Sequence, residues 1–233
     1  MPRHDRRSKF AAQVPPFLLR CLLGLGAVFV PASVQACDLA LLLAIDISGS
    51  VDDSEYRLQV DGTADALLDP EVRDALLYGN VALAVMQWSS IDMQRLVQPW
   101  QMMQNPAAIT AFADQARAQE RAFGKADTAV ADALNFAIAQ FDSAPSCKRR
   151  VIDISGDGVQ NAGSPLPRAR ARAIGNGIVI NAIAIEGIGL AISEFYRRSV
   201  VTKGGFVQTA RGHVEYPHAI RAKLLREIVR PSG

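Results

Sequence analysis

Histidine is scarce in this 233-residue chain, which contains three, and two of these, His213 and His218, lie near the C-terminus. A serine hydrolase needs a base beside its nucleophile, and the usual Gly-x-Ser-x-Gly segment is also missing. We expect both histidines to lie on the surface, and we predict no catalytic residues.

An excess of charge of either sign is also missing. The chain has 25 basic and 23 acidic residues, and residues 1–36 hold five of the basic and one of the acidic ones. The remaining chain therefore carries 20 basic and 22 acidic residues. This balance does not favour a nucleic-acid partner or a polybasic membrane contact.

No stretch after residue 36 is long and apolar enough to cross a bilayer. Four basic residues within the first nine precede an apolar stretch, 17–30, and small residues follow at 31–36. This order is typical of a secretory signal peptide, and the stretch is too short for a stable membrane span. We therefore expect a cleaved leader over 1–36, one domain over 37–233 without an integral membrane span, and a periplasmic or secreted protein. An uncleaved N-terminal anchor is the alternative.

Cysteine is equally rare, with three residues, of which Cys21 would leave with the leader. Cys37 lies nine residues before Asp46, and Cys147 lies ten before Asp157. If both aspartates end neighbouring parallel strands, about 4.8 Å apart, the two cysteines lie close enough for a disulfide. A lipoprotein with lipid on Cys37 is the alternative, although Gln35 is atypical for its cleavage site.

One stretch organises the rest of the chain. Residues 39–45 are continuously apolar and lead into Asp46, Ser48 and Ser50. Such a run is typical of a parallel strand buried on both faces, and residues 53–68 read as the helix that follows it. Ligands of open α/β sheets bind at the carboxyl ends of the strands, and oxygen ligands suit a hard cation. A capped helix start, with Ser50 or Asp52 as N-cap, is the alternative.

Further segments continue this α/β pattern. Strands are predicted at 80–88, 93–100, 149–158, 177–187 and 205–209, and helices at 105–118, 128–141, 165–174, 192–201 and 217–229. The segment 93–100 is polar and contains Pro99, which indicates an edge strand. A hydrophobic fraction of 49% is sufficient for one good-sized domain.

Two of these segments carry further candidate ligands. Thr128 precedes an apolar helical face, where an N-cap is its ordinary role. Asp157 lies between Gly156 and Gly158, where a plain Asp-Gly turn is the alternative. Glycines on both sides would let this loop approach an ion closely.

These segments together resemble von Willebrand factor A domains of the type with a metal-ion-dependent adhesion site. The resemblance covers nearly all of 37–233 and implies a doubly wound, Rossmann-like open sheet, mostly parallel with one antiparallel edge strand and helices on both faces. It also implies a Mg²⁺ or Mn²⁺ ion that leaves a position open for an acidic oxygen of a partner. The implied metal-site residues are Asp46, Ser48, Ser50, Thr128 and Asp157.

The chain departs from the family pattern at two positions. Val130 stands where a second threonine is often found, and Gly156 replaces the threonine of the family's Thr-Asp-Gly segment. The segments around Cys37 and Asp157 also resemble a secreted bacterial family of unknown function, which implies compartment and fold but no ligand.

We therefore expect an exported domain that binds a protein partner with an exposed Asp or Glu through a divalent cation, with Gln160, Asn161 and Glu186 as possible rim residues. A metal-dependent hydrolase and a structural domain with a vestigial metal site are the alternatives. A phosphatase of the haloacid-dehalogenase type would need a second carboxylate where Ser48 stands.

Overall fold

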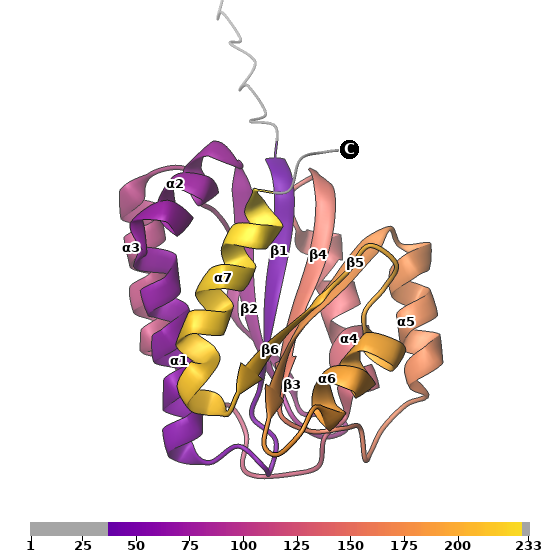
Figure 1. The fold of residues 1–233 in the computed structure, drawn as a ribbon. Helices are drawn as coiled ribbons and strands as arrows, with labels where there is room; N and C mark the ends of the chain where they lie inside the picture. Colours follow the sequence, from indigo (N-terminus) through magenta and orange to yellow (C-terminus); the bar gives the residue numbers. More distant parts are fainter. Residues whose placement is uncertain (1–36, 230–233) are drawn as a thin grey trace, which may run out of the picture. The chain divides into compact units, whose positions relative to one another are not determined.

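The computed structural model describes residues 37–229, which form one six-stranded sheet with helices on both faces (Figure 1). The strands are β1 (Cys37–Asp46), β2 (Val81–Trp88), β3 (Gln94–Met102), β4 (Cys147–Gly156), β5 (Ile178–Glu186) and β6 (Val207–Arg211). The helices are α1 (Asp53–Leu68), α2 (Pro70–Tyr78), α3 (Pro106–Arg117), α4 (Val130–Gln140), α5 (Leu166–Gly175), α6 (Ala191–Phe195) and α7 (Tyr216–Ile228). The predicted leader, 1–36, lies outside the described residues.

The strand order is β3-β2-β1-β4-β5-β6, and β1 therefore lies in the middle of the sheet. All neighbouring strands are parallel except β2 and β3, which form an antiparallel hairpin. The predicted sheet and its antiparallel edge strand are confirmed. Parallel neighbours direct the carboxyl ends of β1, β4 and β5 to one edge of the sheet, which we call the carboxyl edge.

The apolar run of β1 supplies both hydrophobic cores. Leu39, Leu41 and Leu43 face the layer of α1, α2, α3 and α7, whereas Leu42 and Ala44 face α4 and α5. Because successive side chains of a strand point to opposite faces, a strand covered on both faces needs apolar residues at every position. Within 37–229, no helix is long and apolar enough to cross a membrane.

Most element boundaries lie within one or two residues of the prediction, and two of the differences have a clear cause in the backbone hydrogen bonds. The last strand begins at Val207 rather than at Gly205, which lies in a turn where its N–H donates to the Thr202 carbonyl at 2.9 Å. The helix predicted over 192–201 consists of α6 followed by a π-helical turn, Tyr196–Val200. The Val201 N–H donates to the Tyr196 carbonyl and closes that turn.

A cluster of buried charges fixes α7 to the sheet. Lys223 is fully buried, and its Nζ lies 2.5 Å from Asp153 Oδ1 on β4 and 2.6 Å from Glu227 Oε1. Glu227 Oε1 also accepts from Asn181 Nδ2 on β5 at 2.6 Å, which provides the partner that a buried asparagine needs. Burial and the neighbouring Glu227 side chain, against the opposing effect of Lys223, raise the pKa of Asp153 to about 8.

The predicted disulfide is present. Cys37 and Cys147 occupy paired positions of β1 and β4, with 4.3 Å between their Cα atoms, and their sulfurs are bonded. The bond lies at the amino end of β1, as the offsets to Asp46 and Asp157 predict. Because the Cys37 sulfur is bonded to Cys147, the lipid-modified alternative does not describe this structure.

We predict that loss of this bond destabilises the domain without changing its fold. The bond joins residues 110 apart in sequence, so it restricts the unfolded chain strongly. The double variant Cys37→Ala, Cys147→Ala should lose about 2–4 kcal/mol of unfolding free energy in urea titrations. An unchanged transition midpoint would contradict the prediction.

Candidate metal centre

The loop after β1 begins with a buried carboxylate. Asp46 and Ser48 are fully buried, and Asp46 Oδ1 accepts the N–H of Ser48 at 2.7 Å. Asp52 caps α1 by accepting the N–H of Glu55, so Ser50 is not the N-cap. Ser50 is exposed, and its hydroxyl can contact the neighbouring loops at the carboxyl edge.

Hydrogen bonds connect this loop to the aspartate after β4. Ser48 Oγ lies 3.3 Å from Ser50 Oγ, and Ser50 Oγ donates to Asp157 Oδ1 at 2.5 Å. Four of the five predicted ligands therefore form one connected set.

Thr128 lies on a third loop, beside the loop that carries Asp157. Its N–H donates to Asn161 Oδ1 at 2.8 Å, and its carbonyl accepts the N–H of Asn161 at 3.1 Å. A Cβ on Gly158 would lie 3.5 Å from Thr128 Oγ1, so the hydroxyl borders the loop that carries Asp157. The N-cap of α4 is Ala129, and no side chain caps this helix. The capping alternative for Thr128 is therefore wrong.

The electrostatic state of Asp46 is unusual. Burial, together with the nearby Asp157 carboxylate and against the opposing effect of the Ser48 N–H, raises the pKa of Asp46 to about 7. Asp46 Oδ2 is buried and has no hydrogen-bond partner among the described residues. A buried carboxylate oxygen without a donor is costly, and a cation would compensate for it.

Arg121 holds the loop after β1 in place, a role that the sequence did not reveal. Its guanidinium donates to the carbonyls of Ile47 at 2.8 Å and Val51 at 3.0 Å, and its side chain is 14% exposed. Gln59 of α1 adds a bond from Nε2 to the Asp46 carbonyl at 3.1 Å. These donors hold the loop by its backbone and do not use the side-chain oxygens of the candidate ligands.

The expectation of two surface histidines is half wrong. His218 is exposed, whereas His213 is buried, and its Nδ1 lies 3.1 Å from Glu55 Oε1. Its Nε2 lies 4.0 Å from Asp157 Oδ2. His213 belongs to the short helix His213–Glu215 after β6, which places its ring against the start of α1. Sequence position alone does not indicate this long-range contact.

The three predicted rim residues all make bonds within the fold. Gln160 Oε1 accepts the N–H of Ala131 at 2.8 Å, and Asn161 binds Thr128 as described. Glu186 is buried, and its carboxylate accepts the N–H groups at the start of α6. Contact between any of the three and a ligand stays a prediction.

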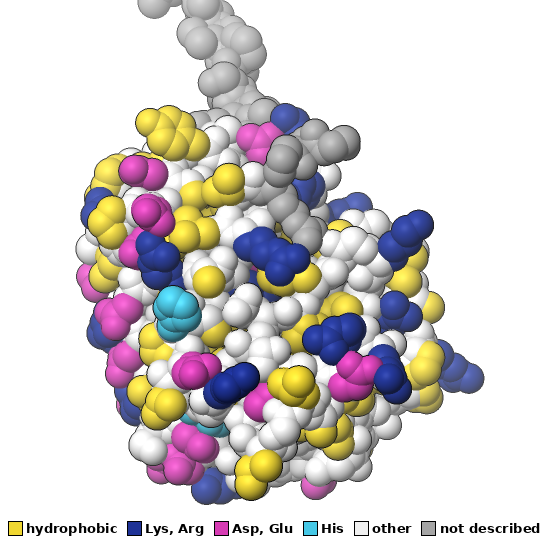
Figure 2. Space-filling view, viewed as in Figure 1, with side chains coloured by type: hydrophobic (Ala, Val, Ile, Leu, Met, Phe, Trp, Pro, Cys, Tyr) yellow, Lys and Arg dark blue, Asp and Glu magenta, His cyan; other side chains and the backbone are white. Residues whose placement is uncertain are grey.

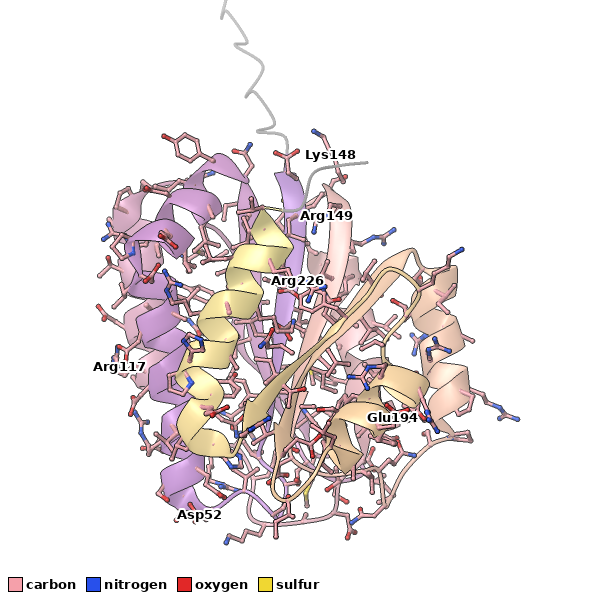
Figure 3. The ribbon with its side chains drawn as sticks, in the orientation of Figure 1. Asp52, Arg117, Lys148, Arg149, Glu194 and Arg226 are labelled. Atoms are coloured by element: carbon pink, nitrogen blue, oxygen red, sulfur yellow. A yellow bond between two sulfur atoms is a disulfide. The ribbon has the colours of Figure 1, made fainter. Side chains whose placement is uncertain are left out.

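The arrangement is rich in hydroxyls and poor in charge. Among residues 37–229, no group of three or more His, Cys, Asp and Glu side chains gathers to hold a metal ion. The set instead offers two carboxylates and three hydroxyls, all hard oxygen donors suited to Mg²⁺ or Mn²⁺. Figure 3 shows Asp52 and Lys148 at opposite ends of the molecule, so this set and the disulfide lie at opposite edges of the sheet.

A family model described as "Protein of unknown function (DUF1194)" matches residues 36–232. A search of the curated proteins finds no match to this chain.

Solved structures with the same fold include a von Willebrand factor type A protein from Catenulispora acidiphila, with 19% identity, a TM-score of 0.60, and coverage of 83% of this chain and 43% of that one. Proximal thread matrix protein 1 from the mussel byssus, described with a zinc-occupied MIDAS motif, has 18% identity, a TM-score of 0.61, and coverage of 83% and 48%. The pilus adhesin SpaC from Lactobacillus rhamnosus GG has 14% identity, a TM-score of 0.59, and coverage of 83% and 30%. This chain spans less than half the length of each of these three chains.

Proposed function

The chain belongs to the DUF1194 family and has the fold of von Willebrand factor A domains, and from this premise we propose that it binds a protein partner through a divalent cation. The cation would be held by Asp46, Ser48, Ser50, Thr128 and Asp157. The observation that carries this proposal is the convergence of three loops on a buried carboxylate with an unpartnered oxygen.

The donors present fit a hard divalent cation. Ser48, Ser50 and Thr128 supply neutral oxygens, and Asp46 and Asp157 supply at most two negative charges. When bound, the ion would supply a Lewis-acidic position that a partner's carboxylate can occupy. The chain's own residues fix the loop backbone through Arg121 and keep the hydroxyls close together, so the site is preorganised. The zinc-occupied MIDAS motif of the mussel byssus protein supports a divalent cation in this fold.

Apolar side chains on the same edge support a protein partner. Figure 2 shows hydrophobic side chains at the surface along its lower edge, which is the carboxyl edge in Figure 1. Five of the eight large hydrophobic residues that are exposed within 37–229 lie on this edge, four on loops and Val214 on the short helix His213–Glu215: Ile91, Val159, Ile188, Leu190 and Val214. Apolar exposure beside a charged site is typical of protein interaction surfaces. The partner's acidic group would therefore be flanked by apolar residues.

Catalysis is not part of the proposal. His213 is the buried base nearest to the candidate ligands, but its Nδ1 is engaged by Glu55. We propose that this ring supports the loops at Asp157 and the start of α1.

Export is part of the proposal. The bonded Cys37–Cys147 pair favours an oxidising compartment, where such bonds persist. The adhesin SpaC and the mussel byssus protein share the fold and support a role outside the cytoplasm. The export signal would lie in 1–36, outside the described residues.

The proposal is tested by partner capture from a periplasmic extract with immobilised protein, in Mg²⁺ and again in EDTA. We expect a partner that is retained only with Mg²⁺ and that is lost with Asp46→Ala. Asp38→Ala is the matched control, because Asp38 lies on the same strand at the opposite edge, paired with Lys148. Equal capture with Mg²⁺ and EDTA would contradict the proposal.

A further inference from the structure

Tyr196 carries a buried hydroxyl that the fold does not use. The residue is fully buried, and its Oη has no hydrogen-bond partner among the described residues. An unpaired buried hydroxyl is costly, and such groups in folded proteins call for a reason, often a ligand, ion or water. The hydroxyl is therefore a candidate functional group.

Gly156 places this hydroxyl beside the cation site. A Cβ on Gly156 would overlap Tyr196 Oη and would lie 3.1 Å from Asp46 Oδ2. Both oxygens therefore border the small space that the missing side chain leaves at the end of β4. Tyr196 Oη is a donor without an acceptor, and Asp46 Oδ2 is an acceptor without a donor.

Two further observations agree with this placement. Burial raises the pKa of Tyr196, and the charges of Asp46 and Asp157 raise it further, so both carboxylates are near the hydroxyl. Tyr196 also opens the π-helical turn Tyr196–Val200, and such turns are frequent at functional sites.

We propose that Tyr196 is a positioning residue of the cation site, whose hydroxyl donates to Asp46 Oδ2, directly or through one water, when the ion is bound. The bond holds the Asp46 carboxylate in one orientation, so that the bound ion has a fixed ligand. Gly156 is part of the same arrangement, because any side chain at that position would displace the hydroxyl. This inference rests on the proposed cation site.

The first test is Tyr196→Phe, which removes only the hydroxyl. Calorimetric titrations of the protein with MgCl₂ and with MnCl₂ should show affinity about 10- to 100-fold weaker than wild type. In EDTA the variant should melt no lower than wild type, because the lost hydroxyl has no partner there. A purely structural tyrosine would change the melting temperature but not the affinity.

Tyr216→Phe is the matched control. Tyr216 is also buried, but its hydroxyl lies 3.4 Å from Thr63 Oγ1 on the other face of the sheet. This variant should bind both cations as wild type does. If the wild type binds the cations and Tyr196→Phe binds them with the same affinity, the inference is overturned and the proposed cation site is not. A wild type that binds neither ion would overturn the cation site itself, and the inference with it.

The second test needs no metal. In EDTA, Gly156→Ala should lower the melting temperature because its methyl group displaces the Tyr196 hydroxyl. The double variant Gly156→Ala, Tyr196→Phe should then melt at a higher temperature than Gly156→Ala. Strictly additive effects would show that the hydroxyl does not occupy the space at Gly156, and they would overturn the inference.

Discussion

Replacing Lys223 with methionine should cost the domain about 3–5 kcal/mol of unfolding free energy at pH 7. The substitution removes the cation from the buried cluster that holds the carboxyl groups of Asp153 and Glu227. Breaking a buried ion pair from one side is costly because the remaining charge has neither solvent nor partner. Urea titrations of wild type and variant measure the effect.

Two comparisons make this result specific to the buried cluster. Lys148→Met removes a lysine of an exposed pair with Asp38 and should cost less than about 1 kcal/mol. The deficit of Lys223→Met should also shrink as the pH falls from 9 to 7, because the pKa of Asp153 is about 8 and its carboxyl group takes up a proton over that range. A deficit below about 1 kcal/mol at pH 7 would show that the cluster does not hold α7 to the sheet.

Replacing Asp46 with asparagine should stabilise the metal-free protein, and more so as the pH rises. The folded pKa of Asp46 is about 7, whereas an ordinary aspartate in the unfolded chain titrates near 3.9. Below about pH 4 the carboxyl is protonated in both states, and the substitution changes little. Between about pH 4 and 7 only the unfolded chain releases its proton, so the wild type loses stability as pH rises.

The gain of Asp46→Asn over wild type, measured by urea titration in EDTA, should therefore grow up to about pH 7 and then level off. Its full size should be on the order of 1–4 kcal/mol. Asparagine keeps an oxygen for the Ser48 N–H, so the comparison isolates the charge. Asp153 also titrates in the fold, but it contributes equally to both proteins. A gain that does not change with pH would contradict the raised pKa of Asp46.

The fold and most of the site could be predicted because their signals are local or repeated. Residues 39–45 are apolar at every position, as expected of a strand that helices cover on both faces, and Pro99 indicates the edge strand. The similar offsets of Cys37 from Asp46, nine residues, and of Cys147 from Asp157, ten residues, predicted that the two cysteines lie side by side on β1 and β4. Two of the three loops then follow from the carboxyl ends of the parallel strands β1 and β4, whereas the loop with Thr128 joins α3 to α4.

The features that were missed depend on contacts between distant residues. Lys223 and Glu227 lie four residues apart, a spacing typical of an exposed helix surface, and only the position of α7 over Asp153 buries them. His213 and Arg121 likewise reach the site from loops without a motif. Gly156 was recognised as a departure from the family's threonine, but the sequence does not show that Tyr196 fills the space.

The most direct measurement of the central claim is the melting temperature of wild type and Asp46→Ala, each in MgCl₂ and in EDTA. Binding to the folded state should stabilise the wild type in proportion to ln(1 + [Mg²⁺]/Kd), about 2.7 kcal/mol at 100 times Kd. Asp46→Ala should fold and melt identically in both solutions. A wild type that melts identically in both, with no heat of Mg²⁺ or Mn²⁺ binding, would contradict the claim and leave a structural domain.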